Sequence, residues 1–290
     1  MTTPVLIDYS YQFGATGYII GGAAFADGTI IDVTNVTGLD QAPIRTSEAA
    51  YEGRDGGILN AVHEDMRKII ITGTIYGGTS PIQTLLEGLK ANYAPTVIAQ
   101  PFYIQPGGIT QRQVYAKSLG FNYPWSTDLR TNKVTFTITL QAEDPTIYGT
   151  ILYDAPGALQ GAAPGHAYNY SYNYNYGSGV FIGQTYLVNN GTKPVGFYAI
   201  IRNPSAQVIN PRILSDTMSA QVTTSISAGS NDVLIFDFYN ESLLLNNAGR
   251  HTSIVNEGWF LLQPGVNSIR FQADSTAQVN IDYQFYDGYR

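Results

Sequence analysis

The sequence predicts a mainly β protein that folds as two domains. Runs of β-branched and aromatic residues are short and are separated by turns rich in Gly, Pro and Asn. One segment alternates strictly between apolar and polar residues, and only one has the spacing of an amphipathic helix. Because a single core stops growing near roughly 250 residues, a chain of 290 residues suits two domains. We expect domains at residues 1–150 and 184–290, joined by a linker at 151–183.

Several strands are expected in the first domain. Residues 30–36 and 68–76 are rich in β-branched side chains and lie between Gly-rich turns, which is typical of strands. Residues 134–140 alternate apolar side chains with Thr, which predicts an antiparallel strand with one buried face. Residues 37–65 show neither pattern, so we expect an extended loop there.

One short helix is expected in the same domain, ending near Asn92. Ser80 can cap its start, and Pro81 suits the first helical position because the N–H that it lacks would be unpaired there anyway. The apolar residues that follow are spaced at i, i+3, i+4 and i+7 and so share one face. They are Ile82, Leu85, Leu86 and Leu89.

The predicted linker changes composition abruptly, first to Pro, Gly and Ala and then to Tyr and Asn. Its tyrosines have a period of two, so an extended conformation would place them all on one face. They are Tyr168, Tyr170, Tyr172, Tyr174 and Tyr176. Two interpretations stay open for these candidate interface residues: a low-complexity spacer, or an ordered strand that contacts a partner.

The second domain reads as a succession of short strands without a helix. Asn-Gly, Asn-Pro, Asn-Asn and Pro-Gly turns separate them, which is typical of a β-sandwich or jelly roll. The expected strands are residues 185–188, 196–202, 208–213, 220–226, 233–238, 242–245, 258–261, 268–272 and 277–286.

The composition favours a subunit of an assembly and excludes several other classes. Charged residues make up only 13%, and the surface must instead use polar neutral side chains and many of the 22 tyrosines, as contact surfaces do. Residues 1–150 hold 9 Lys and Arg against 13 Asp and Glu, so no basic face for nucleic acid or anionic lipid is expected. No apolar run is long enough to span a bilayer, and no signal peptide is visible. We expect synthesis in a cytoplasm-like environment and no membrane partner.

The sequence has few residues of the types that commonly act in catalysis, and it predicts no catalytic residue, cofactor site or metal site. The chain has no cysteine, and His63, His166 and His251 are isolated in loop-like sequence. Glu143 and Asp144 could suggest a glycosidase, but adjacent residues of a strand point to opposite faces. They are better interpreted as a turn before Pro145. We therefore expect a protein that is not an enzyme.

Trp259 is a candidate for stacking on a sugar ring, since carbohydrate-binding modules are built on similar sandwiches. A lone Trp in a β-sandwich more often belongs to the core, and that interpretation stays beside the first.

Two blocks of sequence resemble the distal tail proteins of long-tailed, siphovirus-like bacteriophages. Residues 134–149 (VTFTITLQAEDPTIYG) are similar to the end of that family's N-terminal domain, where an alternating strand enters an Asp-Pro-x-x-Tyr corner. Most of residues 185–286 resembles its C-terminal sandwich, including the segment 259–271 (WFLLQPGVNSIRF), in which a Leu-x-Pro-Gly-x-Asn turn enters a strand. The Tyr and Asn linker has no counterpart in this resemblance.

The resemblance implies a structural protein of the virion tail tip, or baseplate, that is assembled in the host cytoplasm. An N-terminal belt domain, a β-sandwich or split barrel with one short helix, would close a homo-hexameric ring, and a galectin-like or carbohydrate-module-like sandwich would project outward. The ring would join the tail tube protein to the tail hub and to a receptor-binding protein or fibre. DNA would pass through an acidic lumen without specific binding.

Other functions remain as alternatives. The chain could be a carbohydrate-binding module that contacts host-surface glycans, a glycoside hydrolase, or another virion protein of the tube or fibre.

Overall fold

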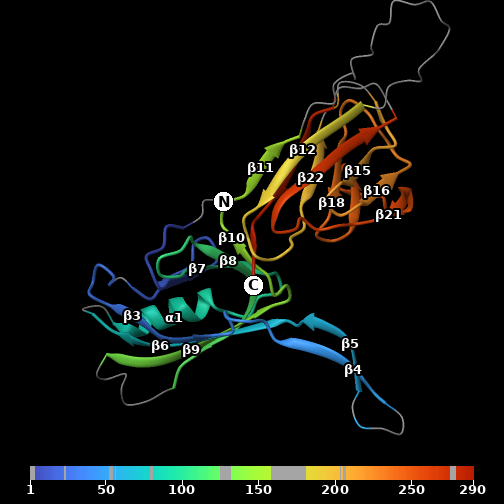
Figure 1. Ribbon diagram of the computed structural model, residues 1–290. Coiled ribbons are helices and arrows are strands. Elements are labelled where there is room, and N and C mark those ends of the chain that lie inside the picture. Colours follow the sequence, from blue (N-terminus) through green and yellow to red (C-terminus); the bar gives the residue numbers. More distant parts are fainter. Residues whose placement is uncertain are drawn as a thin grey trace, which may run out of the picture. The chain divides into compact units, whose positions relative to one another are not determined.

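A computed structural model describes residues 4–22, 24–51, 55, 57–78, 81–124, 132–157, 181–202, 204, 207–274 and 279–290. The chain divides into two compact units: unit 1, residues 1–150 with 289–290, and unit 2, residues 151–288. Both are built from antiparallel strands, and the mainly β fold expected from the sequence is confirmed (Figure 1).

Unit 1 is built on a large antiparallel sheet with one helix. Along its path the strands lie in the order β2-β1-β7-β8-β9-β6-β3, and β10 pairs with β8. The elements are β1 (Ser10–Phe13), β2 (Ile19–Ile20), β3 (Ile30–Thr37), β4 (Ile44–Ala50), β5 (Gly57–Glu64), β6 (Arg67–Tyr76), α1 (Ile82–Asn92), β7 (Gln100–Gln105), β8 (Arg112–Asn122), β9 (Lys133–Ala142) and β10 (Ile147–Gly149).

The long strand β8 connects the two halves of this sheet. Its first part pairs with β7 and its second part with β9, and the register with β9 shifts between Ser118 and Gly120. Such a bulge bends a strand and increases its twist. The sheet therefore curls around α1, which lies against it in Figure 1.

The predicted helix is present as α1. Ile82, Leu86 and Leu89 are buried in the core of unit 1 and Leu85 packs against it, so the i, i+3, i+4 spacing identified the buried face. Pro81 lies just before the first helical residue and makes no side-chain cap. Ser80 lies outside the described residues.

The predicted strands of unit 1 are present, but the expected loop at residues 37–65 is wrong. Residues 44–50 and 57–64 form β4 and β5, which pair with each other in a separate two-stranded sheet. The described side chains of β4 are all exposed, so no alternation between buried and exposed positions marks it as a strand.

Gly73, in the middle of β6, has no room for a side chain. A Cβ at this position would lie 2.2 Å from the carbonyl oxygen of Asp32 and 2.6 Å from Cζ of Phe136. We expect Gly73→Ala to lower the free energy of unfolding of unit 1 by about 1–3 kcal/mol, because the Phe136 ring must move. Thermal unfolding checks this. Gly249→Ala, where a Cβ would meet nothing within 4 Å, is the control; equal midpoints for the two variants would contradict the packing argument.

Unit 2 is a two-layer sandwich (Figure 1). One sheet has the order β11-β23-β13-β18-β19-β20 and the other β12-β22-β15-β16-β21, with β14 and β17 paired separately. The elements are β11 (Tyr153–Pro156), β12 (Phe181–Asn189), β13 (Tyr198–Arg202), β14 (Val208–Ile209), β15 (Arg212–Ser215), β16 (Ala220–Thr224), β17 (Ser227–Ala228), β18 (Val233–Asp237), β19 (Ser242–Leu245), β20 (Ala248–Gly249), the 3-10 helix η2 (His251–Ser253), β21 (Ile254–Glu257), β22 (Gly265–Ala273) and β23 (Ile281–Phe285).

Alternation explains why these segments form a sandwich. On β22, Asn267, Ile269, Phe271 and Ala273 are buried while the residues between them are partly or fully exposed, so each sheet contributes one face to the core. Phe197 and Phe238 stack at its centre with ring centroids 4.0 Å apart.

The sequence misplaced several elements of unit 2. Residues 153–156 and 181–183, expected in the linker, belong to β11 and β12. Residues 258–261 are not a strand; the strand β21 lies immediately before them. Residues 208–213 are divided between β14 and β15 at Pro211, whose ring removes the N–H that a continuous strand needs.

The last residues of the chain belong to unit 1. β24 (Gly288–Tyr289) pairs with β10, and the guanidinium of Arg112 lies 4.0 Å from the centroid of the Tyr289 ring. This cation–π contact holds the C-terminal strand to β8.

Tyr93 in unit 1 and Tyr283 in unit 2 are fully buried, and we expect them to lower the free energy of unfolding at alkaline pH. Neither hydroxyl has a hydrogen-bond partner among the described residues. Burial raises the pKa of both above the ordinary value of 10.0, so folding favours the neutral forms. Below about pH 10 both tyrosines are neutral in the folded and the unfolded chain, and the free energy of unfolding is unaffected. As the pH rises further, it falls, because the two tyrosines lose their protons in the unfolded chain but stay neutral in the folded one.

We expect the thermal midpoint of unit 1 to fall between about pH 9 and 11, and Tyr93→Phe to reduce that fall. The loss should approach about 1.4 kcal/mol for each pH unit per tyrosine. Scans at several pH values check this, and an identical fall in the wild type and in Tyr93→Phe would contradict it.

Candidate assembly surfaces

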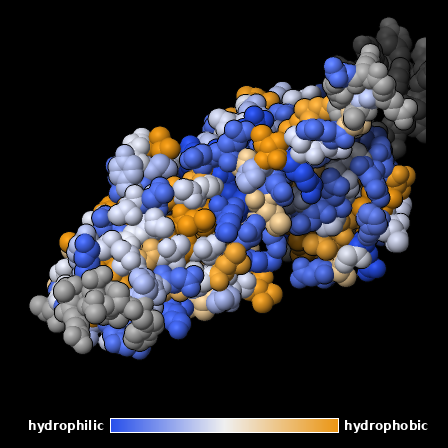
Figure 2. Space-filling model, turned by 90° about the horizontal axis from the view of Figure 1, so that it is seen from below, coloured by the Kyte–Doolittle hydropathy of each residue, from blue (hydrophilic) through white to orange (hydrophobic). Residues whose placement is uncertain are grey.

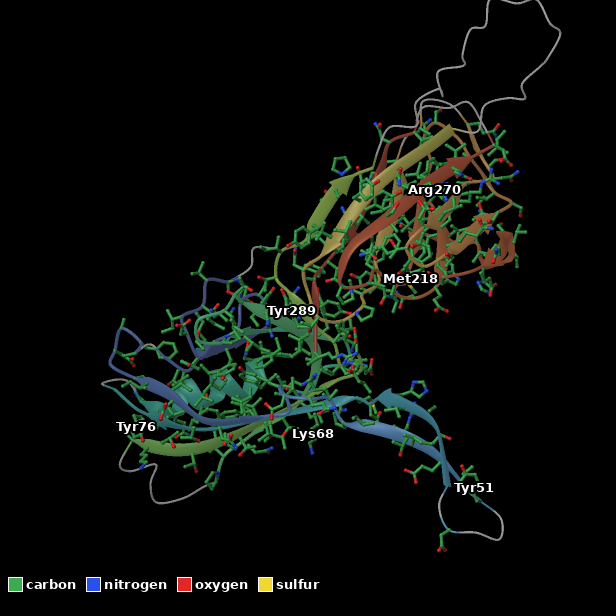
Figure 3. All side chains as sticks on the ribbon, viewed as in Figure 1. Tyr51, Lys68, Tyr76, Met218, Arg270 and Tyr289 are labelled. Atoms are coloured by element: carbon green, nitrogen blue, oxygen red, sulfur yellow. The ribbon has the colours of Figure 1, made fainter. Side chains whose placement is uncertain are left out.

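A two-stranded arm is the most prominent surface feature of unit 1. β4 and β5 pair only with each other, and Figure 1 shows them extending away from the main sheet. Tyr51 lies at the far end of the arm (Figure 3). A two-stranded hairpin without further packing is marginally stable in water. We therefore expect the arm to be stabilised by packing against another surface.

A β-bulge brings three apolar side chains to one face of the arm, where Glu48 and Glu64 lie beside them. Thr46 pairs with Val62 and Glu48 pairs with Leu59, so Asn60 is the extra residue on β5. Because directly opposed residues share a face, Leu59 and Val62 lie on the face that also carries Ile44. The three side chains are 55%, 54% and 50% exposed. Without the bulge, Leu59 and Val62 would lie on opposite faces.

Other apolar side chains of unit 1 also reach the surface. Val97 and Ile98, in the connection from α1 to β7, are almost fully exposed, as is Val5 near the N-terminus. Figure 2 shows apolar side chains at several separate places among hydrophilic ones on the face in view. Apolar side chains that are scattered singly over a surface are normal and do not by themselves mark a contact.

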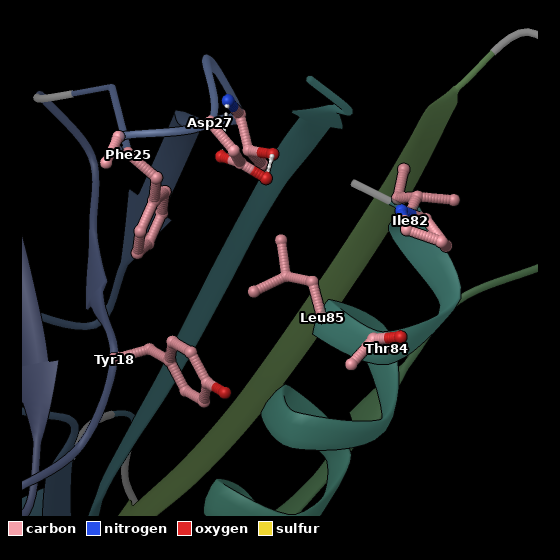
Figure 4. A pocket seen from close by; sticks show the side chains of 9 residues that line it. Tyr18, Phe25, Asp27, Ile82, Thr84 and Leu85 are labelled. Atoms are coloured by element: carbon pink, nitrogen blue, oxygen red, sulfur yellow. Dashed lines mark hydrogen bonds between the residues drawn. The ribbon is translucent and has the colours of Figure 1, made fainter. Parts of the chain in front are cut away.

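An apolar hollow of about 370 Å³ lies beside the start of α1 (Figure 4). Tyr18, Phe25, Ile82 and Leu85 line it. Asp27, at its rim, accepts hydrogen bonds of 3.0 Å from the backbone N–H and the hydroxyl of Thr29. The carboxylate is thus used to hold the turn. The hollow is suited to receiving an apolar side chain rather than to acid–base chemistry.

The Asp-Pro-x-x-Tyr corner after β9 has a structural role. Asp144 accepts hydrogen bonds from the backbone N–H of Thr146 (2.9 Å) and from the hydroxyl of Tyr148. Glu143 instead forms an ion pair with Lys117. The two carboxylates therefore have different partners, and their arrangement does not support a catalytic pair.

Arg67 is buried beside this corner, with 1% of its surface exposed. Its guanidinium donates hydrogen bonds to the carbonyl oxygens of Pro145 (3.0 Å), Gly38 (2.7 Å) and Asp40 (3.0 Å). Burial lowers the pKa of Arg67 from 12.5, and nearby Glu64, Asp40 and Asp144 oppose that shift. Arg67 thereby joins the end of β3 to the Asp-Pro corner.

The remaining candidates from the sequence are placed as follows. Trp259 is half-buried, and its ring packs edge-on against Phe238 with centroids 5.1 Å apart, so its stacking on a sugar stays a prediction. Residues 168–176, with the five tyrosines, lie outside the described residues, as does His166. His63 is on β5 and His251 begins η2.

Neither a metal centre nor a membrane-spanning helix was found in the described part of the chain. There, no three His, Asp or Glu side chains are grouped so that they could hold a metal ion. None of the helices described has the length and apolar character needed to cross a bilayer.

The sequence did not predict the arm as an assembly surface. Leu59 and Val62 are three residues apart, which places them on opposite faces of a regular strand, and only the bulged pairing brings both to the face of Ile44. The Gly-rich run at residues 53–57 between two polar segments could have suggested a hairpin, but it does not show that both faces are exposed.

Comparisons with known proteins agree with the resemblance identified in the sequence. Residues 190–286, about a third of the chain, match the family model described as "Siphovirus-type tail component, C-terminal domain". This match lies within the C-terminal block of the resemblance, and the resemblance to distal tail proteins is confirmed. No curated protein matches the sequence.

One solved structure shows the same fold over nearly the whole chain. The crystal structure of the Dit protein of phage SPP1 is similar with a TM-score of 0.60 and 13% identity, covering 96% of this chain and 99% of that one. Chains of the phage P2 baseplate, solved in its activated conformation with Ca and with Sr, give TM-scores of 0.47 and 0.45 at 9% and 8% identity. They cover 95% and 94% of this chain and 98% and 97% of theirs.

Proposed function

We propose that this chain is a non-enzymatic structural subunit of a siphovirus-type phage tail tip, where it forms a closed ring. The family match of residues 190–286 supports the tail component, and the fold of the SPP1 Dit protein supports the position at the distal end. That protein is described as a paradigm of the hub adsorption apparatus in phages that infect Gram-positive bacteria. We place this chain in the virion, after assembly in the host cytoplasm.

The arm is the observation that supports the proposed ring. One face of the arm exposes Ile44, Leu59 and Val62, and the main sheet of unit 1 carries different exposed apolar residues. A contact between two different surfaces of one subunit repeats from copy to copy and closes when the rotation allows. We expect each arm to lie on the next copy, with six copies in the ring.

The two units would then face different partners. Unit 1 would form the belt around the channel and contact the tail tube, while unit 2 would lie outside and contact the hub and a receptor-binding protein or fibre. DNA would pass through the lumen without specific binding, because 9 Lys and Arg against 13 Asp and Glu in residues 1–150 give a net negative charge.

Cross-linking from a single introduced cysteine tests the arm contact. The natural chain has no cysteine, so Val62→Cys carries one photoactivated cross-linker on the arm face that holds Ile44 and Leu59. A ring contact predicts a ladder of covalent oligomers that ends at the number of copies in the ring. Val255→Cys, at an exposed position of β21 in unit 2, should give no such ladder. A product that stops at the dimer would indicate a symmetric contact and would overturn the proposal.

A further inference from the structure

We propose that the outer face of the β12-β22-β15-β16 sheet in unit 2 binds a neutral saccharide, with Tyr186 as the stacking surface and Asp216 and Arg270 as the hydrogen-bonding centre. This site goes beyond the proposed assembly role and does not depend on the ring. It does not include Trp259, whose half-buried ring packs edge-on against Phe238.

Strand register places these side chains together. On the outer face, Tyr186 of β12 is opposite Ser268 of β22, and Gln184 is opposite Arg270. Leu214 of β15 is the next neighbour of Arg270, and Gln221 of β16 follows it. Arg270 is marked in Figure 3. The face thus combines one aromatic ring with several polar side chains, and Leu214 separates Arg270 from Gln221.

The polar groups are ordered by one another. Nε2 of Gln184 donates to the hydroxyl of Ser268 (2.9 Å), and that hydroxyl donates to the carboxylate of Asp216 (3.1 Å). The guanidinium of Arg270 donates to the other carboxylate oxygen. Such a network holds its donors and acceptors in place before a ligand arrives, which lowers the entropic cost of binding.

A shallow pocket of about 310 Å³ adjoins this network. Leu214, Asp216, Ser219, Gln221 and Arg270 are among its lining residues. The volume is at the lower end of the range for small-ligand sites. A sugar ring bound there could use both Asp216 and Arg270, which together offer acceptors and planar donors for neighbouring hydroxyls.

Tyr186 supplies the apolar half of the site. Its side chain is 64% exposed, and the neighbouring Val188 and Val266 are exposed on the same face. A pyranose ring has one face of C–H groups and a rim of hydroxyls. It therefore matches a surface on which an exposed aromatic ring adjoins ordered polar side chains.

Charge balance favours a neutral ligand. Arg270 is paired with Asp216, and Arg212 on the same face is paired with Asp274 at 3.0 Å. No described cation on this face lacks an acidic partner, so a phosphate or nucleic acid would have to compete with a carboxylate for each arginine.

Ligand-observed NMR on the full chain tests the site. The probes are the methyl glycosides of glucose, galactose, rhamnose and N-acetylglucosamine, each up to about 10 mM. We expect at least one to bind in the millimolar range, and Tyr186→Ala or Asp216→Asn to weaken that binding by about tenfold or more. Tyr186→Phe, which keeps the ring, should bind nearly as the natural chain does.

Tyr9→Ala is the matched control, because Tyr9 is an equally exposed tyrosine in unit 1. Circular dichroism and thermal midpoints show whether each variant is folded. Absence of binding by all four glycosides would overturn the proposal. Binding that is unchanged in both folded variants, Tyr186→Ala and Asp216→Asn, would also overturn the proposal. The sugar would then bind elsewhere, and this face would be free to contact a protein partner. Either result is independent of whether the chain forms a ring.

Discussion

Replacing Leu59 and Val62 with aspartate is expected to convert the ring into monomers while unit 1 remains folded. Both side chains are exposed on one face of the arm, so neither supports the core of its own unit. Surface substitutions of this kind change the free energy of unfolding by about 0.5 kcal/mol or less. Burying two unpaired carboxylates in a contact between copies costs several kcal/mol in each contact.

Light scattering after size exclusion measures this change, and far-UV circular dichroism verifies folding. Met218→Asp is the control, because Met218 is exposed in a turn of unit 2, where Figure 3 marks it. Rings that persist in the double variant at the wild-type mass would show that the arm does not form the contact.

Arg67→Met is expected to destabilise unit 1 more than any other single substitution considered above. The three carbonyl oxygens that Arg67 holds are on Gly38, Asp40 and Pro145, and methionine can satisfy none of them. A hydrogen bond to a charged group contributes about 1.5–3 kcal/mol, so the loss of three such bonds should lower the free energy of unfolding by about 3 kcal/mol or more. The thermal midpoint of unit 1 should fall by about 10 °C.

Lys68→Met is the matched control, since it removes the same charge from the next residue of β6, where the side chain is exposed. It should change the midpoint little. Equal midpoints for the Arg67 and Lys68 variants would contradict the assigned role of Arg67 as the link between the end of β3 and the Asp-Pro corner.

The sequence predicted those parts of the fold in which burial follows a simple period. α1 was found because Ile82, Leu86 and Leu89 form one buried face, and β9 because every second residue from Val134 is buried. β7 and β8 were not predicted, although both are buried in the core. In β8 the register shift between Ser118 and Gly120 interrupts the alternation, so the pattern does not extend along the strand.

The candidate surfaces were harder to predict because they depend on pairing between distant segments. Nothing near Tyr186 in the sequence distinguishes it from the other tyrosines, and its neighbour Ser268 lies opposite only in the folded sheet. The Asp-Pro-x-x-Tyr corner was recognised, but its buried partner Arg67 comes from another strand. Trp259 was a candidate for stacking on a sugar because of its residue type, and in the structure its half-buried ring packs edge-on against Phe238.

The mass of the purified chain in solution, measured together with electron micrographs of the same sample, tests the proposed assembly most directly. We expect a particle of six copies with a central hole, seen end-on as a six-fold ring. A species that remains monomeric at every concentration, both alone and mixed with the tail tube protein, would contradict the proposal that this chain forms the ring of a phage tail tip.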